Sequence, residues 1–356
     1  MASTRILLSE GSSLSGRQAT TTLGLAGYRV DVCDPDPLCL SRFSRFVGRV
    51  HRCPPMGSDP LGYLEFVVEL IAREGFAVLL PTHEQAYLFA SAPDRLPSTI
   101  GVALASFESF ERLQSKVEFN RLLTELALPH PRTHLVSSSR ELVKTDVFPA
   151  YIKTDIGTAS RGVRLVRNAS ELTQTACDLE LEGAFGDAIL VQEALIGWLE
   201  RAQAIFEGGR LVGSHSYRQV IAGPGGGDIA KISIRRPVVS RHLAELGQHL
   251  NWHGALSVDY ILDEHGNPHY IDCNPRLVEP VNAMLAGVPL TETLVRLSLG
   301  ESVSELPPGR EGIRTHNAPG KTGPQPNNCE SGGASGDGLD DLTEAWKNSL
   351  RCRSTG

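Results

Sequence analysis

The chain has 356 residues, with 34 Lys and Arg against 41 Asp and Glu, which gives a net charge of −7. This length exceeds one ordinary core and predicts two or three lobes, at about 150 residues for each. The net negative charge creates no overall field that would attract nucleic acid or an anionic membrane, so neither is expected as a partner. Any phosphate-binding site must therefore be local.

The seven cysteines are odd in number and contain no C-x-x-C pair, so neither a disulfide framework nor a zinc ribbon is expected. No apolar run approaches the roughly 20 residues that span a bilayer, and residues 1–10 lack the basic-then-apolar layout of a signal peptide. We therefore expect a cytoplasmic protein.

The first ~105 residues carry two β-loop-α-β patterns. Strands are predicted at 5–9 and 28–32 around a helix at 18–26, and a helix within 59–74 precedes a strand at 76–80. In the second helix the apolar residues recur at helical spacing: Leu64, Val67, Val68 and Ile71. The pattern predicts an open parallel sheet.

The loop from Gly11 to Gly16 resembles a dinucleotide-binding turn only superficially. Its glycines are five residues apart with none between them, so it does not match G-x-G-x-x-G. We interpret it as a tight turn beneath a helix N-terminus. Asp34, at the end of the second strand, could hold a ribose, but Asp34-Pro-Asp-Pro37 is also ordinary turn chemistry, which we favour.

From Ser115 the chain changes to an α+β pattern, with a helix through Phe119 to Leu126 and short strands alternating with helices over 150–262. After Thr315 the chain becomes rich in Gly, Pro, Asn and Ser and has too few apolar residues to build a core. The expected division is an N-terminal Rossmann-like lobe at 1–105, a small lobe at 106–190, a large lobe at 191–315 and a disordered tail at 316–356.

Two acidic residues flank the turn at Glu264-His-Gly-Asn267. If the hairpin is centred between His265 and Gly266, Asp259 lies directly opposite Asp272. Facing carboxylates repel, and a divalent cation between them would remove the conflict. Asn274 follows on the same face, and such a set of oxygens suits Mg²⁺. The alternative is a polar strand end with no metal.

A second pattern begins at Lys153, which ends the apolar strand Ala150-Tyr-Ile-Lys153 and precedes a loop of small residues, Gly157-Thr-Ala-Ser-Arg-Gly162. A lysine beside free backbone N–H groups can grip an oligophosphate. The loop is not a Walker A loop, because no G-K-[ST] follows it. Alternatively, the loop is an ordinary turn and Lys153 is a solvated side chain.

Two weaker features complete the pattern. Lys116 lies in the first turn of its helix, where the helix dipole disfavours a cation. An apolar strand over 188–192 runs into a bend after Glu193, with Leu195 and Glu200 just beyond. Such a strand could serve as an adenine-binding hinge, although an ordinary strand end explains it too.

Taken in order, helix-start lysine, strand lysine, glycine loop, hinge, two acids and Asn274-Pro-Arg276 resemble the ATP-grasp superfamily over roughly 106–299. The family includes biotin carboxylase, D-alanine:D-alanine ligase and carbamoyl phosphate synthase. The resemblance implies an α/β and α+β ATP-grasp fold with an N-terminal Rossmann-like parallel-sheet lobe. Its most specific parts are Lys153 with Gly157 to Val163, and Asp259 with Asp272-Cys-Asn-Pro-Arg276.

The resemblance implies a role for each matching position. The residues implied to bind ATP are Lys116, Lys153, Gly157, Ser160, Gly162, Glu193, Leu195 and Glu200, the last through the ribose. Those implied to hold Mg²⁺, with Mn²⁺ as a substitute, are Asp259, Asp272 and Asn274. Arg276 matches the catalytic arginine that steadies the transferred phosphoryl group.

Three features depart from the family pattern. Both metal acids are Asp where Glu is frequent, Gly197-Trp-Leu-Glu200 is one residue longer than the common G-x-E, and the tail after Arg314 does not resemble a family lobe. These departures affect the ribose contact and the substrate more than the metal and phosphate sites.

The activity implied by the resemblance is that of a Mg·ATP-dependent ligase. It would activate a carboxylate as an acyl phosphate for attack by an amine or amino acid, with ADP and phosphate as products. An ATP-dependent carboxylase-like enzyme that uses bicarbonate is the first alternative. A catalytically decayed, nucleotide-binding regulatory protein is the second. The sequence names neither the carboxylate nor the nucleophile, and it leaves the oligomeric state open.

Overall fold

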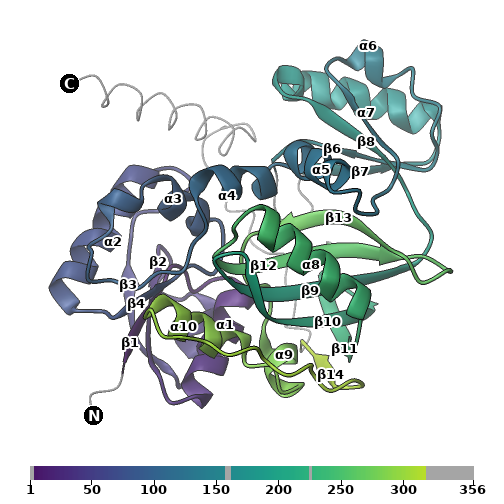
Figure 1. Cartoon of the computed structure of the whole chain (residues 1–356). Coiled ribbons are helices and arrows are strands. Elements are labelled where there is room, and N and C mark those ends of the chain that lie inside the picture. The colour runs from purple at the N-terminus through teal and green to yellow at the C-terminus, as the bar shows by residue number, and fades with distance from the viewer. Residues whose placement is uncertain (1–3, 157–161, 224–226, 318–356) are drawn as a thin grey trace.

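The computed structural model describes residues 4–156, 162–223 and 227–317. Within them lie three sheets of four, six and four strands, and Figure 1 shows them as three lobes. No described helix has the length and apolar character needed to cross a lipid bilayer.

The N-terminal lobe contains the predicted parallel sheet, in the order β3-β2-β1-β4. Its elements are β1 (Arg5–Leu8), α1 (Leu14–Leu25), β2 (Arg29–Asp34), the 3₁₀ turn Leu40–Phe43, β3 (Val47–Arg52), α2 (Pro60–Glu74), β4 (Val78–Leu80), α3 (Gln85–Ser91) and the 3₁₀ turn Pro93–Arg95. The sequence pattern missed β3, whose residues are mostly polar or exposed. It also started the first helix four residues late, because Ser13 caps α1 by accepting the Gly16 N–H.

The loop before α1 is the predicted tight turn. Asp34 accepts the Gly11 N–H at 2.9 Å through Oδ2 and the Asp36 N–H at 2.9 Å through Oδ1. Both carboxylate oxygens are therefore committed to the local backbone, which confirms the turn interpretation of Asp34.

The small lobe is an antiparallel sheet in the order β5-β8-β6-β7, covered by α7. The chain reaches it through α4 (Phe107–Gln114) and α5 (Lys116–Glu125), which pack on the core of the large lobe. The elements of the small lobe are β5 (Thr133–Val136), α6 (Ser139–Leu142), β6 (Ala150–Lys153), β7 (Val163–Val166), α7 (Ala169–Leu181), the 3₁₀ turn Ala184–Gly186 and β8 (Ile189–Glu193).

The large lobe is a six-stranded antiparallel sheet in the order β13-β12-β9-β10-β11-β14. Its elements are β9 (Trp198–Glu207), β10 (Arg210–Ala222), β11 (Asp228–Ile234), α8 (Pro237–His249), β12 (Gly254–Leu262), β13 (Pro268–Asn274), α9 (Val281–Leu285), α10 (Leu290–Ser298) and β14 (Arg314–His316). The strand β14 ends at His316, the first residue of the predicted tail, and Asn317 is the last described residue.

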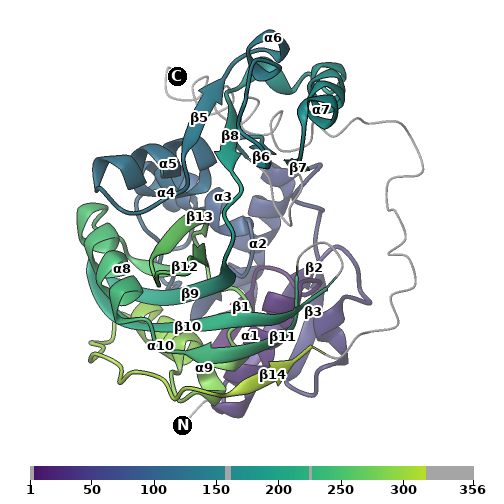
Figure 2. The same ribbon diagram turned by 90° about the vertical axis from the view of Figure 1, so that its right-hand side faces the viewer.

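The two faces of the large sheet have different partners. On β9, Ala202, Ala204 and Phe206 pack with α4, α5 and α8, whereas Ile205 packs with the N-terminal lobe and α10. Since side chains alternate along a strand, Arg201 and Gln203 share the face of Ile205. This face looks toward the N-terminal lobe. Figure 2 shows β8 of the small lobe running into β9 through a short extended segment.

Candidate active site

The acid pair lies where the hairpin rule predicts it. Asp259 on β12 is directly paired with Asp272 on β13, and Asn274 follows two residues later, opposite Ser257. The geometry differs in one detail. Near the turn, Leu262 pairs with Pro268, and one extra residue on β13, Ile271, then shifts the register back. The pairing of Asp259 with Asp272 is confirmed, and it depends on this bulge.

The electrostatics of the acid pair suit a cation. Burial raises the pKa of Asp259 and Asp272 adds to that rise, while Arg201 opposes it. Asp272 accepts the Cys273 N–H at 3.1 Å through Oδ1. Within residues 4–156, 162–223 and 227–317, no three His, Cys, Asp or Glu side chains gather into a metal site. A cation here would take two carboxylates, an amide and oxygens from phosphate or water, which is the coordination that Mg²⁺ uses with nucleotides.

Lys153 connects the small lobe to the strand that carries Asp272. Its Nζ donates to Gln192 Oε1 at 2.8 Å and to the Ile271 carbonyl at 2.9 Å, and the residue is 6% exposed. Burial, opposed by Asp272 and assisted by the nearby Lys116, lowers the pKa of Lys153 to about 8. The structure therefore brings Lys153, Lys116 and the acid pair into one electrostatic cluster.

The position of Lys116 is set by the start of α5. Ser115 caps this helix by accepting the Glu118 N–H, and the Lys116 N–H donates to the Asp155 carbonyl at 3.1 Å. The Ser115 hydroxyl also donates to Asp155 Oδ1 at 2.6 Å. Because Asp155 lies two residues after Lys153, these bonds tie the beginning of α5 to the end of β6.

The predicted phosphate loop is described only at its end. Gly157 and Ser160 lie outside the described residues. Gly162 has φ +73°, and its carbonyl accepts the Thr154 N–H at 2.9 Å, which closes the base of the β6–β7 hairpin. A Cβ at this position would lie 2.0 Å from Thr154 Oγ1, so the turn requires glycine.

The predicted hinge is the segment between β8 and β9. The Glu193 N–H donates to the Arg132 carbonyl at 2.9 Å, and the Ala194 N–H donates to the Pro149 carbonyl at 3.0 Å. Over the part of the chain that the structure describes, the backbone N–H and carbonyl of Leu195 have no hydrogen-bond partner. Leu195 therefore offers main-chain groups of the kind that could read an adenine edge.

Glu200 lies apart from the acid pair. It precedes Arg201 on β9, so it points to the opposite face of the sheet, and it has no exposed surface. Arg218 donates to Oε1 at 2.8 Å, and Arg236 donates to both carboxylate oxygens, at 2.7 and 2.8 Å. A ribose hydroxyl could reach Glu200 only if this cluster opened, so the ribose contact stays a prediction.

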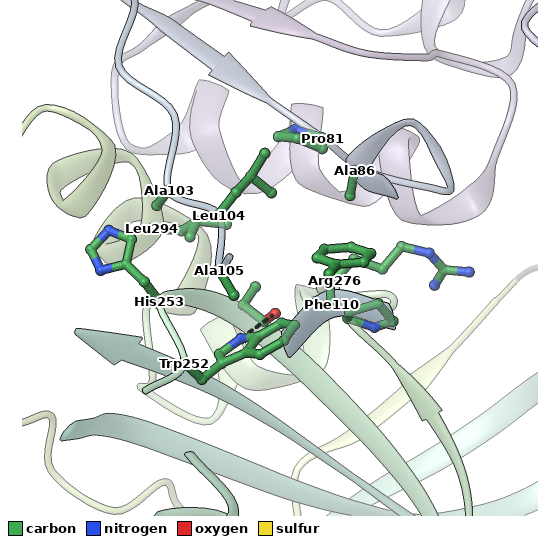
Figure 3. A pocket seen from close by; sticks show the side chains of 12 residues that line it. Pro81, Ala86, Ala103, Leu104, Ala105, Phe110, Trp252, His253, Arg276 and Leu294 are labelled. Atoms are coloured by element: carbon green, nitrogen blue, oxygen red, sulfur yellow. Dashed lines mark hydrogen bonds between the residues drawn. The ribbon is translucent and has the colours of Figure 1, made fainter. Parts of the chain in front are cut away.

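Arg276 lies where the large lobe meets the N-terminal lobe. Its Nη2 donates to Glu84 Oε1 at 3.0 Å, and burial lowers its pKa to about 10. His83, beside Glu84, is partly buried, and this burial lowers its pKa to about 3. Figure 3 shows an apolar pocket next to Arg276, with Phe110 and Trp252 in its wall and the guanidinium extending away from them. The acid pair and Lys153 do not line this pocket.

Sequence reasoning missed three charged residues at this site. Lys231 on β11 is 2% exposed and binds Glu279 Oε2 at 2.8 Å, and Glu279 has the unusual backbone φ of +54°. Arg201 donates to Asp259 Oδ2 at 3.1 Å. The available signal was a cation inside a strand next to apolar residues, with Arg201 before Ala202 and Lys231 between Ala230 and Ile232.

Three lobes thus converge on a cluster of lysines and aspartates, with a hinge at one side. A cluster of this kind, between two sheets, has the charges that suit a nucleotide and its divalent cation. No protein-family model matches the chain.

The chain is similar to enzymes of known activity. It is 25% identical to the carbamoyl phosphate synthase large chain of Deinococcus radiodurans over 81% of its own length, and 29% identical to the biotin carboxylase of Nostoc over 45%. It covers only 29% and 39% of those proteins.

Solved structures show the same fold. The biotin carboxylase domain of 2-oxoglutarate carboxylase from Hydrogenobacter thermophilus, solved with MgADP and bicarbonate, has a TM-score of 0.69 at 16% identity, covering 87% of this chain and 73% of that one. For the L-amino acid ligase from Bacillus licheniformis the TM-score is 0.64 at 15% identity, with 83% and 74% covered. The chain has the ATP-grasp fold, and the predicted resemblance to ATP-grasp ligases and carboxylases is confirmed.

Proposed function

We propose that the chain is a Mg·ATP-dependent ligase that activates a small-molecule carboxylate as an acyl phosphate for attack by an amine or amino acid. One observation carries this proposal: Lys153 of the small lobe donates to the Ile271 carbonyl, directly beside Asp272 of the acid pair. A phosphate-binding cation and the metal acids therefore meet at the boundary of two lobes. Holding a nucleoside triphosphate between two lobes requires such a meeting of a cation and metal ligands.

The residues of the chain have distinct tasks in this reaction. The main chain of Glu193 and Leu195 positions adenine, and Glu200 is the predicted ribose contact. Lys116, Lys153 and the loop of Gly157, Ser160 and Gly162 hold the phosphates. Asp259, Asp272 and Asn274 hold Mg²⁺, which supplies charge neutralisation and alignment of the phosphate oxygens.

Arg276 is the residue best placed to act on the reacting groups. Its guanidinium is buried between the acid pair and the N-terminal lobe, so it can neutralise charge on the transferred phosphoryl group as the carboxylate attacks in line. The acyl phosphate must be shielded from water until the amine displaces phosphate. Closure of the small lobe over the acid pair would provide this shielding.

A second candidate is an ATP-dependent carboxylase-like activity, in which bicarbonate is the carboxylate. The observation that favours it is the similarity to biotin carboxylase and to a biotin carboxylase domain solved with bicarbonate. In both candidates the partners are small molecules, and their need for ATP favours the cytoplasm as the place of action.

One screen tests the proposal. Purified protein with Mg·ATP is incubated with pairs of amino acids or small acids and amines, and with bicarbonate alone, while ADP and phosphate release are measured. Release that requires a carboxylate and an amine supports the ligase, whereas release with bicarbonate alone supports the second candidate. Tight Mg·ATP binding without release under any mixture would identify the decayed, nucleotide-binding protein instead. Asp272→Asn is the matched inactive control.

A further inference from the structure

Arg201 is a buried cation that contacts the metal site directly. On β9 it is paired with Asp259 on one side and with Tyr217 on the other. Its Nε donates to Asp259 Oδ2 at 3.1 Å, and its Nη1 is bonded to Asp228. The Arg201 side chain is 13% exposed, and those of Asp259 and Asp228 are 19% and 4% exposed. A guanidinium is always charged, so this position carries a permanent positive charge.

Each metal acid has one carboxylate oxygen that accepts a hydrogen bond and one that accepts none within the described residues. Oδ2 of Asp259 is taken by Arg201, and Oδ1 of Asp272 is taken by the Cys273 N–H. Within the described residues, the other oxygen of each carboxylate accepts no further hydrogen bond. Each aspartate can therefore serve as a single-oxygen ligand, and Asn274 adds one amide oxygen. Three such ligands fill half of the octahedron that Mg²⁺ requires, and nucleotide oxygens and water can fill the rest.

A second metal ion would need the carboxylate oxygens that already accept hydrogen bonds, Oδ2 of Asp259 and Oδ1 of Asp272. Two-metal sites place their cations about 3.5–4 Å apart. At that spacing both ions would have to draw on the same few carboxylate oxygens. Here Oδ2 of Asp259 accepts a hydrogen bond from the Arg201 guanidinium, whose positive charge repels a cation near that oxygen. Arg201 supplies one fixed positive charge at this side of the acid pair, where another divalent ion would bring two.

We propose that Arg201 takes the place of a second divalent cation, so that the chain binds one metal ion per nucleotide through Asp259, Asp272 and Asn274. Arg201 is a positioning residue, because it acts through Asp259 and through Asp228. The inference rests on the proposed nucleotide function and extends it to the number of metal ions.

The experiment counts metal ions directly. Free Mn²⁺ is measured by electron paramagnetic resonance while Mn²⁺ is titrated into the full chain with saturating adenylyl imidodiphosphate, a nucleotide that is not hydrolysed. Wild type should bind one Mn²⁺ per chain. Arg201→Gln frees Asp259 Oδ2 and removes a buried positive charge, so it should bind two, with about tenfold tighter apparent affinity for the first. Arg201→Lys keeps the charge and should stay at one.

A matched control separates this effect from the general loss of a buried ion pair. Arg5→Gln removes a partly buried arginine that binds Asp31 at 3.4 Å in the N-terminal lobe, and it should leave the Mn²⁺ count at one. Two Mn²⁺ per wild-type chain would overturn the inference even if Arg201→Gln failed to fold. An unchanged count and affinity in folded Arg201→Gln would overturn it as well. Absence of any Mn²⁺-dependent nucleotide binding by wild type would refute the proposed function itself.

Discussion

Lys153→Met should change how the stability of the chain depends on pH. Lys153 has a pKa of about 8 in the folded chain, against an ordinary value of 10.5. Between these values the unfolded chain binds a proton that the folded chain does not, so stability rises with pH in this window. Below pH 8 both states are charged, and the cost of burying the charge is fully present. The gap between a pKa of about 8 in the folded chain and 10.5 in the unfolded chain, at about 1.36 kcal/mol for each pH unit, corresponds to about 3 kcal/mol of unfolding free energy.

Methionine removes this cost together with two hydrogen bonds. Leaving the Ile271 carbonyl and Gln192 without their donor costs about 1–3 kcal/mol, so the variant should be close to wild type or somewhat more stable at pH 7. As the pH rises to 10.5, the unfolding free energy of the wild type should then increase by about 3 kcal/mol relative to that of the variant.

Urea unfolding of both proteins with EDTA and no nucleotide, at pH 7, 8, 9 and 10, measures this difference while other titrations cancel. If the difference in unfolding free energy between wild type and variant stays constant across the pH series, Lys153 is not a buried, ionised lysine. In the same variant at pH 7, thermal stabilisation by Mg·ATP should fall sharply, and equal shifts in both proteins would remove Lys153 from the phosphate site.

Three further predictions concern the metal, the hinge and the end of the described chain. Asp272→Asn should abolish turnover and weaken Mg²⁺-dependent nucleotide binding, and wild-type kinetics with unchanged Mg²⁺ dependence would exclude Asp272 as a ligand. Gly197→Ala places a Cβ 2.3 Å from the Leu262 carbonyl, so it should displace the hinge and lower ATP affinity in calorimetry, with unchanged affinity counting against the adenine assignment. A chain ending at Asn317 should bind nucleotide normally. A chain ending at Thr315 loses the Asn317 bonds to the Asp228 carbonyl and Glu279 Oε2 and should unfold about 1–2 kcal/mol more easily, a difference that equal urea midpoints would contradict.

The sequence predicted the parts of the fold that follow from local periodicity. The two β-loop-α-β units and the antiparallel hairpin are of this kind, since a strand period and a turn determine them, whereas the pairing of Asp259 with Asp272 also needs the bulge at Ile271. It could not predict that α4 and α5 pack on the large sheet, because that choice depends on which lobe offers a matching apolar face. Nor could it find Arg201 at Asp259, because β9 and β12 become neighbours only when the sheet forms.

Lys153 shows the same limit in energetic terms. Its place at the end of a strand suggests a solvated cation, and only the contact between lobes buries it. The depressed pKa belongs to the assembled structure and is absent from the segment that carries the residue.

The bulge at Ile271 has a consequence for any attempt to uncouple the lobes. The acceptor that Lys153 finds on β13 is a main-chain carbonyl, so no substitution of the Ile271 side chain can delete it. The contact therefore requires no particular side chain at position 271, so an invariant residue is not expected there in related sequences. The contact can be abolished from the large lobe only by changing the chain length of β13. Deleting Ile271 would remove that carbonyl together with the register shift, while Asp272, which would then directly follow Tyr270, would stay opposite Asp259.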